Sequence, residues 1–171
     1  MTKKLLLSLT IISSTLFAME PINIPMVTAK GKKLDLRIDD FGLKVQNRWG
    51  NKALLLVFFG THCPACDAEM PALKKIHKET KDLIVLGIQT EDNVRDKQLV
   101  DFAKYKGLNY PVVNFSYSME LIDFIRTNLN WGGEIPKIYL FDRSGKYQKD
   151  YTGALSKERL LKDLREIRYG K

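Results

Sequence analysis

The stretch FFGTHCPACDAEMP, residues 58–71, contains Cys63 and Cys66, the only two cysteines of the 171-residue chain. It overlaps the apolar run KALLLVFFG, which is typical of a strand buried on both faces, and it leads into ALKKIHKET, which has helical spacing. Gly60 therefore ends a strand, and Cys63 falls at the start of the next helix. In open α/β sheets, ligands bind and reactions take place at the carboxyl ends of the strands. The sequence thus predicts a functional site around the two cysteines.

The residues around Cys63 favour a reactive thiol. Pro64 suits the first helical position, because its missing N–H costs nothing there. A helix N-terminus presents unpaired N–H groups and a partial positive charge, which lower the pKa of a thiol. We therefore expect Cys63 to be the nucleophile and Cys66, one turn later, to be the resolving thiol. Such a pair attacks a client disulfide through a mixed disulfide and releases the client by internal attack.

Two other interpretations of the cysteine pair are weaker. A purely structural disulfide would close a loop too short to restrict the unfolded chain much. A zinc or copper site would need the two histidines, but His62 is adjacent to Cys63, and His77 lies eleven residues past Cys66. This is not the usual spacing of zinc ligands. We therefore expect neither a metal nor another cofactor, and we expect His77 on the surface of its helix.

The N-terminus has the pattern of a secretory signal. Two lysines precede an uncharged, mostly apolar run of thirteen residues, and Ala18 offers a small residue for cleavage. Thirteen helical residues, at about 1.5 Å each, do not cross a hydrocarbon core of about 30 Å, so a permanent membrane helix is the weaker interpretation. We predict a signal peptide over residues 1–18, a single domain over residues 19–171 and a periplasmic location. An uncleaved signal would anchor the protein to the membrane.

The composition is that of a globular protein, with 44% hydrophobic and 28% charged residues. The formal charge is +8, and it falls to +6 when residues 1–18 are removed with their two lysines. The basic residues are scattered among acids, as in SKERLLKDLREIRYGK. This pattern indicates a solvated surface with a basic bias. We expect no nucleic-acid partner, because an exported protein rarely meets one.

The rest of the chain alternates strands and helices. An extended segment, MEPINIPM, comes before the stretches KKLDLRI and GLKVQN, which predict a β-hairpin around DDFG. Further strands are predicted at DLIVLGIQT and YPVVNF, and a second hairpin at PKIYLFD and YQKDYTG. Three more helices are predicted, one closed by Gly107 and two begun by the caps Ser118 and Ser156. This order predicts an α/β fold whose central mixed sheet has helices on both faces.

The cysteine stretch resembles the active site of the thioredoxin superfamily, and more narrowly that of the exported TlpA/ResA/CcmG (DsbE)-like thiol–disulfide oxidoreductases. Their pattern F-W-x-x-W-C-x-x-C-x-x-E-x-P is met by FFGTHCPACDAEMP. A second segment, IPKIYLFDRSGKY, resembles the one that carries the family's cis-proline. The resemblance spans residues 24–167 and implies a thioredoxin-like fold. It also implies a catalytic cis-proline at Pro136, with the Ile135–Pro136 peptide pairing with an extended client.

The chain departs from the family pattern at two positions. His62 stands where thioredoxins place Trp before the first cysteine. As a cation it would stabilise the Cys63 thiolate, and as a neutral residue it would contact the substrate. Val57 occupies the position of the buried Asp of cytoplasmic thioredoxins, so another acid must manage the proton of Cys66.

Glu69 matches the Glu of the family motif and lies three residues after Cys66. A carboxyl packed against the sheet would be desolvated and its pKa raised, which suits it to proton exchange near neutral pH. Asp67 is expected at the surface. Pro71 lies inside the same helix, where the superfamily has a kink.

Four residues are predicted to bind substrate: His62, Pro64, Trp131 and Ile135. Trp131 and the two glycines after it precede Pro136, so they line the substrate groove or form a tight loop around a packed Trp. Both alternatives remain open at the level of sequence.

The sequence favours an exported reductant of client disulfides. By resemblance, its clients would be cysteine pairs such as the C-x-x-C-H of apocytochrome c, and its electrons would come from a membrane donor of the DsbD/CcdA type. The protein is expected to be a monomer. An isomerase of the V-shaped dimer type is disfavoured, because about 35 residues between Ala18 and the first buried strand leave no room for its dimerisation domain. The alternatives are a disulfide oxidase or isomerase and, less favoured, a metal chaperone.

Overall fold

The computed structural model describes residues 20–40, 42–46, 50, 52–153 and 156–169. The predicted signal peptide over residues 1–18 and its cleavage point lie outside these residues. Among the helices of the described ranges, none has both the length and the apolar character needed to cross a membrane.

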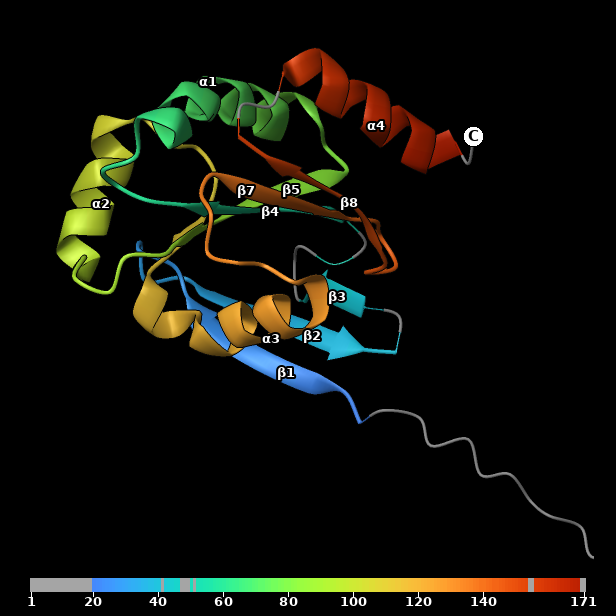
Figure 1. Cartoon of the computed structure of the whole chain (residues 1–171), viewed down its shortest axis with the longest axis horizontal. Coiled ribbons are helices and arrows are strands. Elements are labelled where there is room, and N and C mark those ends of the chain that lie inside the picture. The colour runs from blue at the N-terminus through green and yellow to red at the C-terminus, as the bar shows by residue number, and fades with distance from the viewer. Residues whose placement is uncertain (1–19, 41, 47–49, 51, 154–155, 170–171) are drawn as a thin grey trace, which may run out of the picture.

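A five-stranded sheet forms the centre of the molecule (Figure 1), with its strands in the order β6-β5-β4-β7-β8. The strands are β4 (Ala53–Phe59), β5 (Leu83–Gln89), β6 (Val112–Val113), β7 (Lys137–Phe141) and β8 (Tyr147–Thr152). β4, β5 and β6 run parallel, whereas β7 is antiparallel to both β4 and β8. The predicted mixed sheet and its terminal hairpin are therefore confirmed.

β4 is buried on both faces, as its apolar run predicts. Successive residues of a strand point to opposite faces, so each face receives every second side chain. One face carries Leu54, Leu56 and Phe58. The other face carries Leu55, Val57 and Phe59. All six side chains belong to residues that are at most 2% exposed.

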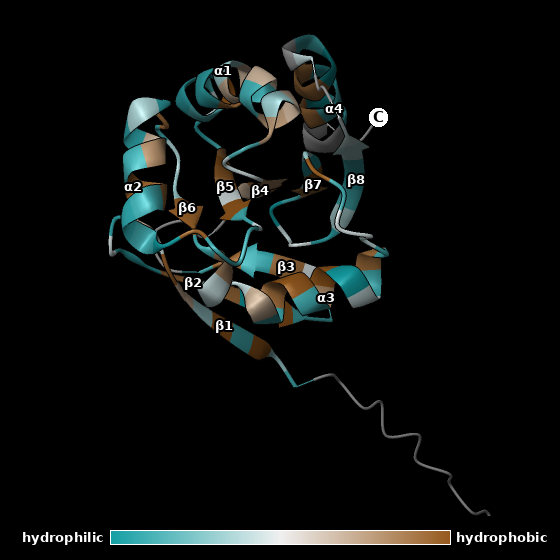
Figure 2. Ribbon diagram, turned by 60° about the vertical axis from the view of Figure 1, so that its left-hand side comes forward, coloured by the Kyte–Doolittle hydropathy of each residue, from teal (hydrophilic) through white to brown (hydrophobic). Residues whose placement is uncertain are grey.

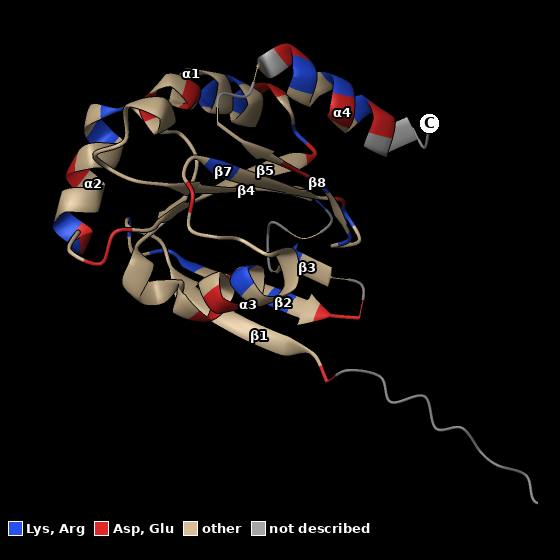
Figure 3. Cartoon of the chain, viewed as in Figure 1, with Lys and Arg blue, Asp and Glu red and all other residues tan. Residues whose placement is uncertain are grey.

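Helices lie on both faces of the central sheet (Figure 1). One face is covered by α1 (Pro64–Glu79), α2 (Asp96–Tyr105) and α4 (Lys157–Tyr169). The other is covered by α3 (Met119–Leu129) and a three-stranded sheet of β1 (Ile22–Val27), β2 (Lys33–Asp39) and β3 (Gly42–Val45). Hydrophilic residues predominate on the outer sides of the helices (Figure 2), and α1, α2 and α4 each carry both acidic and basic residues (Figure 3). The scattered charge predicted from the sequence is thus visible on these helices.

The small sheet contains the predicted hairpin, because β2 and β3 pair antiparallel from Leu36 opposite Val45 to Asp39 opposite Gly42. β1 adds a strand along the other side of β2. The sequence predicted only an extended segment there. Pro25 lies within β1, where its missing N–H is tolerated because β1 is an edge strand.

Three helix ends lie where the sequence predicts them. Gly107 follows α2 with φ +61°, and the Arg159 N–H donates to Ser156 Oγ at 3.2 Å, as an N-cap requires. Ser118 is the N-cap residue of α3, as predicted, but its side chain makes no capping hydrogen bond. Its hydroxyl is directed at the carbonyl oxygens of Asn114 and Phe115, each at 3.1 Å, so it fixes the turn before α3.

His77 also differs from its prediction, because it is only partly exposed and its imidazole has a structural role. Its Nδ1 accepts a hydrogen bond from the backbone N–H of Val85 in β5 at 3.2 Å. Burial, and then the nearby positive charge of Lys52, lower the pKa of His77. The ring therefore stays neutral and ties α1 to the central sheet.

Candidate active site

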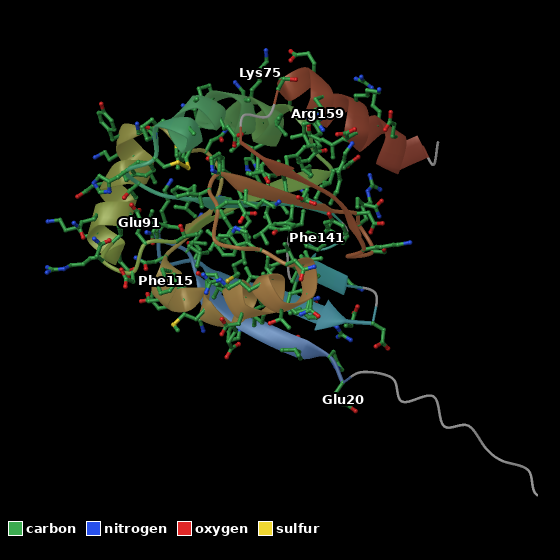
Figure 4. All side chains as sticks on the ribbon, in the orientation of Figure 1. Glu20, Lys75, Glu91, Phe115, Phe141 and Arg159 are labelled. Carbon is green, nitrogen blue, oxygen red and sulfur yellow. A yellow bond between two sulfur atoms is a disulfide. The ribbon has the colours of Figure 1, made fainter. Side chains whose placement is uncertain are left out.

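Cys63 and Cys66 form a disulfide at the N-terminal end of α1, with an Sγ–Sγ distance of 2.15 Å and a Cα–Cα distance of 5.2 Å. Figure 4 shows it as a yellow bond beside the first turn of the helix. Cys63 is the N-cap, with Pro64 in the first turn, and the Cys66 N–H donates to Cys63 Sγ at 3.1 Å. An N–H directed at this sulfur stabilises a thiolate there. The structure thus has the local geometry that the sequence predicts.

The two sulfurs differ in access. Cys66 is 2% exposed and packs in the core beneath α1, whereas Cys63 is only partly buried. Pro64 and His62, on either side of Cys63, are exposed. A client disulfide therefore reaches Cys63 first, which favours Cys63 as the attacking residue and Cys66 as the resolving one.

The loop before β7 lies against this site. The Ile135–Pro136 peptide bond is cis, as the resemblance implied. A Cβ atom placed on Gly60 would lie 2.9 Å from Cδ1 of Ile135 and 3.5 Å from Cβ of Cys63. The end of β4, the cysteine loop and the proline loop therefore meet closely at Gly60, where any side chain would have to displace Ile135.

A small void beneath the disulfide is lined in part by Glu69. Its lining includes Cys66, Val57, Tyr110 and Pro136, and it is too small to admit a water molecule. Glu69 is 3% exposed, so its predicted burial against the sheet is confirmed. Burial, and then the nearby charge of Glu69, raise the pKa of the Tyr110 phenol. Glu69 is thus an acid in the interior beside Cys66, with little access to water.

Asp67, the other acid near the cysteines, lies in a different environment. Its side chain is 36% exposed and pairs with Nζ of Lys106 at 2.8 Å. Asp67 is thus less exposed than predicted, since its Oδ1 is buried, but its ion pair with Lys106 makes it a natural control for Glu69. Pro71 lies in α1 and is exposed.

Trp131 is withdrawn from the surface, which agrees with the packed-loop alternative and not with a groove lined by its ring. It is 5% exposed, and its ring centroid lies 4.3 Å from that of Phe58. Its Nε1 donates to the carbonyl of Glu134 at 2.9 Å, and the Arg126 guanidinium lies 5.6 Å from the ring centroid. The indole therefore fixes the turn that leads to Pro136.

Glu91 is a further residue at this site, and it is not among the site residues predicted from the sequence. It follows β5, and Figure 4 labels it on the side of the molecule where the disulfide lies. Its Oε2 accepts from the backbone N–H and the hydroxyl of Thr61, at 2.6 and 2.7 Å, and from the Gln89 amide at 3.1 Å. Its Oε1 lies 3.2 Å from Nδ1 of His62. Burial raises the pKa of Glu91, but the hydrogen bonds from Thr61, Gln89 and His62 outweigh it and bring the value to about 2.

A signal for Glu91 was present in the sequence. The carboxyl ends of neighbouring parallel strands meet at one edge of a sheet, so an acid directly after the predicted strand DLIVLGIQT belongs near Cys63.

Among the described residues, no three His, Cys, Asp or Glu side chains gather in the way that a metal site requires.

Comparison with known proteins agrees with this geometry. The AhpC/TSA family pattern matches residues 24–150 of the chain. The thiol-disulfide oxidoreductase ResA of Bacillus thuringiensis subsp. konkukian is 27% identical over 157 residues, which cover 86% of this chain and 76% of that protein. The thioredoxin-like protein YneN of Bacillus subtilis is 31% identical over 136 residues, which cover 73% of this chain and 75% of that protein.

A solved structure agrees in fold. The thiol:disulfide interchange protein of the thioredoxin family from Chlorobium tepidum TLS superposes with a TM-score of 0.66 at 24% identity, over 85% of this chain and 92% of that one. The two chains thus share the thioredoxin-like fold. From the family match, these relatives and the disulfide at the N-terminus of α1, we conclude that the chain belongs to the AhpC/TSA family of thioredoxin-like proteins and is a thiol–disulfide oxidoreductase.

Proposed function

We propose that the protein works outside the cytoplasm as a reductant of client disulfides. The observation that carries this proposal is the carboxyl of Glu69 in a dry, apolar space beside Cys66. A strongly oxidising pair needs a stabilised reduced form. A buried acid next to the second cysteine has the opposite effect, because its charge and the lack of water both disfavour a thiolate there. The dithiol then gives up its electrons readily.

The residues support a sequence of two exchanges. The Cys63 thiolate attacks a client disulfide and forms a mixed disulfide, and the client's leaving sulfur takes up a proton. Glu69 then accepts the proton of the Cys66 thiol. Cys66 attacks Sγ of Cys63, the intramolecular disulfide forms, and the second client sulfur leaves as a thiol.

The client would bind along the edge formed by His62, Pro64 and the Ile135–Pro136 peptide. Because Ile135 precedes a cis-proline beside Cys63, its backbone would pair with an extended client segment. Clients such as the C-x-x-C-H segment of apocytochrome c fit this proposal, and so does a membrane electron donor of the DsbD/CcdA type. We further propose that residues 1–18 act as the export signal and that the exported domain is a monomer.

The direction of electron flow is tested by equilibrating the Cys63–Cys66 pair in glutathione buffers. We expect a reduction potential well below about −220 mV, as for a reductant. A value near about −120 mV would contradict the proposal and favour the oxidase or isomerase alternative, for which the N-cap position of Cys63 is the supporting observation.

The role of Glu69 is tested with Glu69→Gln, which keeps the size of the side chain and removes its charge. Without a proton acceptor beside Cys66, release of the mixed disulfide near neutral pH should slow by about 10²-fold, the lower end of the usual range for general base catalysis. The Cys66 thiol should also ionise at lower pH, because a like charge is removed. Rapid-quench trapping and alkylation as a function of pH measure the two effects.

Asp67→Asn is the matched control, since it neutralises an acid on the same helix that is paired with Lys106 outside the void. It should change the release rate and the thiol titration little. Identical titrations and rates for Glu69→Gln and the wild type would leave Glu69 as a packing residue only.

A further inference from the structure

We propose that His62 and Glu91 form an imidazole–carboxylate pair that carries the proton of the exchange at Cys63. His62 is the group that meets the reacting sulfurs, and Glu91 is a positioning residue that acts through it. The proposal concerns the attack at Cys63 and rests on the thiol–disulfide exchange itself, not on whether the protein reduces or oxidises its clients.

The hydrogen bonds determine which ring nitrogen of His62 carries the proton. The Thr61 hydroxyl donates its single proton to Oε2 of Glu91 at 2.7 Å. Its oxygen can therefore only accept in the 3.0 Å contact with Nδ1 of His62. The ionised carboxylate of Glu91 is also only an acceptor, and it lies 3.2 Å from the same nitrogen. Nδ1 is thus the donor in both contacts, so the neutral ring carries its lone pair on Nε2.

The ring is open to a client while its inner edge is held. The His62 side chain is 87% exposed, whereas that of Glu91 is only 25% exposed. Among the described contacts, Glu91 is the one charged group that lies against the imidazole ring of His62. Since Nδ1 is engaged with Thr61 and Glu91, Nε2 is the nitrogen left to exchange a proton with a bound client.

Glu91 is held rigidly enough to orient the ring. Gln89, which is 0% exposed at the end of β5, donates to the Glu91 backbone oxygen at 2.8 Å and to its Oε2 at 3.1 Å. The Gln89 amide oxygen in turn accepts from the Phe115 N–H at 3.3 Å. A buried amide on the central sheet therefore fixes the carboxylate, and the carboxylate fixes the Thr61–His62 segment directly before Cys63.

The carboxylate also lies close to the nucleophile. A Cβ atom on Gly60 would lie 3.5 Å from the carboxyl carbon of Glu91 and equally 3.5 Å from Cβ of Cys63. Cys63 and the Glu91 carboxylate therefore lie at similar distances from Gly60, and His62, which directly precedes Cys63, contacts the carboxylate through its side chain.

The proposed step balances as follows. Nε2 of His62 takes the proton of the Cys63 thiol, and the thiolate attacks one sulfur of the client disulfide. The electron pair of the thiolate forms the Cys63–client bond, and the pair of the client S–S bond leaves with the other client sulfur. That sulfur takes the proton back from Nε2, so the ring returns to its neutral state. His62 thus serves the first thiol of the pair and Glu69 the second.

The test measures the single-turnover reduction of hydroxyethyl disulfide by the reduced protein as a function of pH, with the variants His62→Gln, Glu91→Gln and the double variant. Hydroxyethyl disulfide has a basic leaving thiolate that needs a proton. His62→Gln should slow its reduction near neutral pH by about 10-fold, less than full general acid–base catalysis provides because a thiolate is a good leaving group. The loss should be smaller with an aromatic disulfide, whose leaving thiolate is stable without a proton.

Three comparisons separate a proton-carrying role from a merely structural one. The pH profile of the wild type should contain a limb that is absent in His62→Gln and reduced in height in Glu91→Gln. The double variant should be no slower than His62→Gln alone, because Glu91 acts through His62. Asp92→Asn, which neutralises the exposed acid next in the chain, should match the wild type.

A wild-type pH profile in His62→Gln would overturn the proposal. So would a Glu91→Gln variant that loses thermal stability but keeps the wild-type profile, since Glu91 would then only hold the loop. The reduction potential of the wild type is measured separately, so an oxidising potential would refute the proposed reductant function and leave this test unaffected.

Discussion

Replacing Cys63 with serine should abolish thiol–disulfide exchange, whereas replacing Cys66 with serine should trap covalent complexes with client proteins. Cys63 is the accessible sulfur at the helix N-cap, so without it no mixed disulfide forms. Cys66 is 2% exposed and lies directly beneath it, so without Cys66 the mixed disulfide forms but is not resolved internally. Non-reducing gels and mass spectrometry of extracts from cells that produce each variant give the measurement.

The matched control is the variant with both cysteines replaced, which should trap nothing. The assignment of the two sulfurs would be reversed if Cys63→Ser trapped clients and Cys66→Ser did not. Full turnover by Cys66→Ser would show that a single thiol suffices and that the two-step mechanism is wrong.

Replacing Trp131 with alanine should lower the free energy of unfolding by about 3–5 kcal/mol, the usual cost of removing a large buried aromatic side chain. The indole is 5% exposed and packs on Phe58, so its loss leaves a cavity between the central sheet and α3. Chemical denaturation followed by circular dichroism measures the change. Trp131→Phe keeps most of the apolar contact but loses the hydrogen bond to Glu134. The loss of this hydrogen bond should lower the free energy of unfolding by about 1 kcal/mol, in addition to the effect of the smaller ring.

The result also decides between the two roles that the sequence left open for Trp131. A packed residue changes stability first, and it changes exchange rates only as far as the loop before Pro136 loosens. If Trp131→Ala kept the wild-type unfolding free energy and instead weakened client binding, the ring would contact the client and the packed-loop assignment would be incorrect.

Features set by local sequence were predictable, and features set by distant contacts were not. The apolar run of β4 and the proline after Cys63 determine a buried strand and a helix start within a few residues of each other. The burial of Glu69 follows from helical periodicity once the face of Cys66 is known. Each of these depends on neighbours within about one or two helical turns.

Glu91, His77 and Ser118 show where such reasoning stops. Thr61 and Glu91 are 30 positions apart, and their hydrogen bonds exist only because two parallel strands end side by side. The partner of the His77 imidazole is a backbone group on β5, which no side-chain pattern reveals. The Ser118 hydroxyl could bond either to the helix that follows or to the turn that precedes it. It donates to the turn, because the conformation of that turn places the carbonyl oxygens of Asn114 and Phe115 within reach.

The hydrogen bond between His77 and β5 bears on how molecules of this protein associate with one another. β6 has only two residues, which pair with Gly87 and Ile88, so the backbone N–H of Val85 lies beyond its reach. An open backbone donor on a sheet edge is a template on which a strand of another molecule can add, and such addition is the first step of aggregation. Because the His77 imidazole accepts a hydrogen bond from this N–H, the backbone donor of Val85 is not left open beyond the end of β6. A side chain of α1 thus covers part of the β5 edge that a longer β6 would otherwise cover.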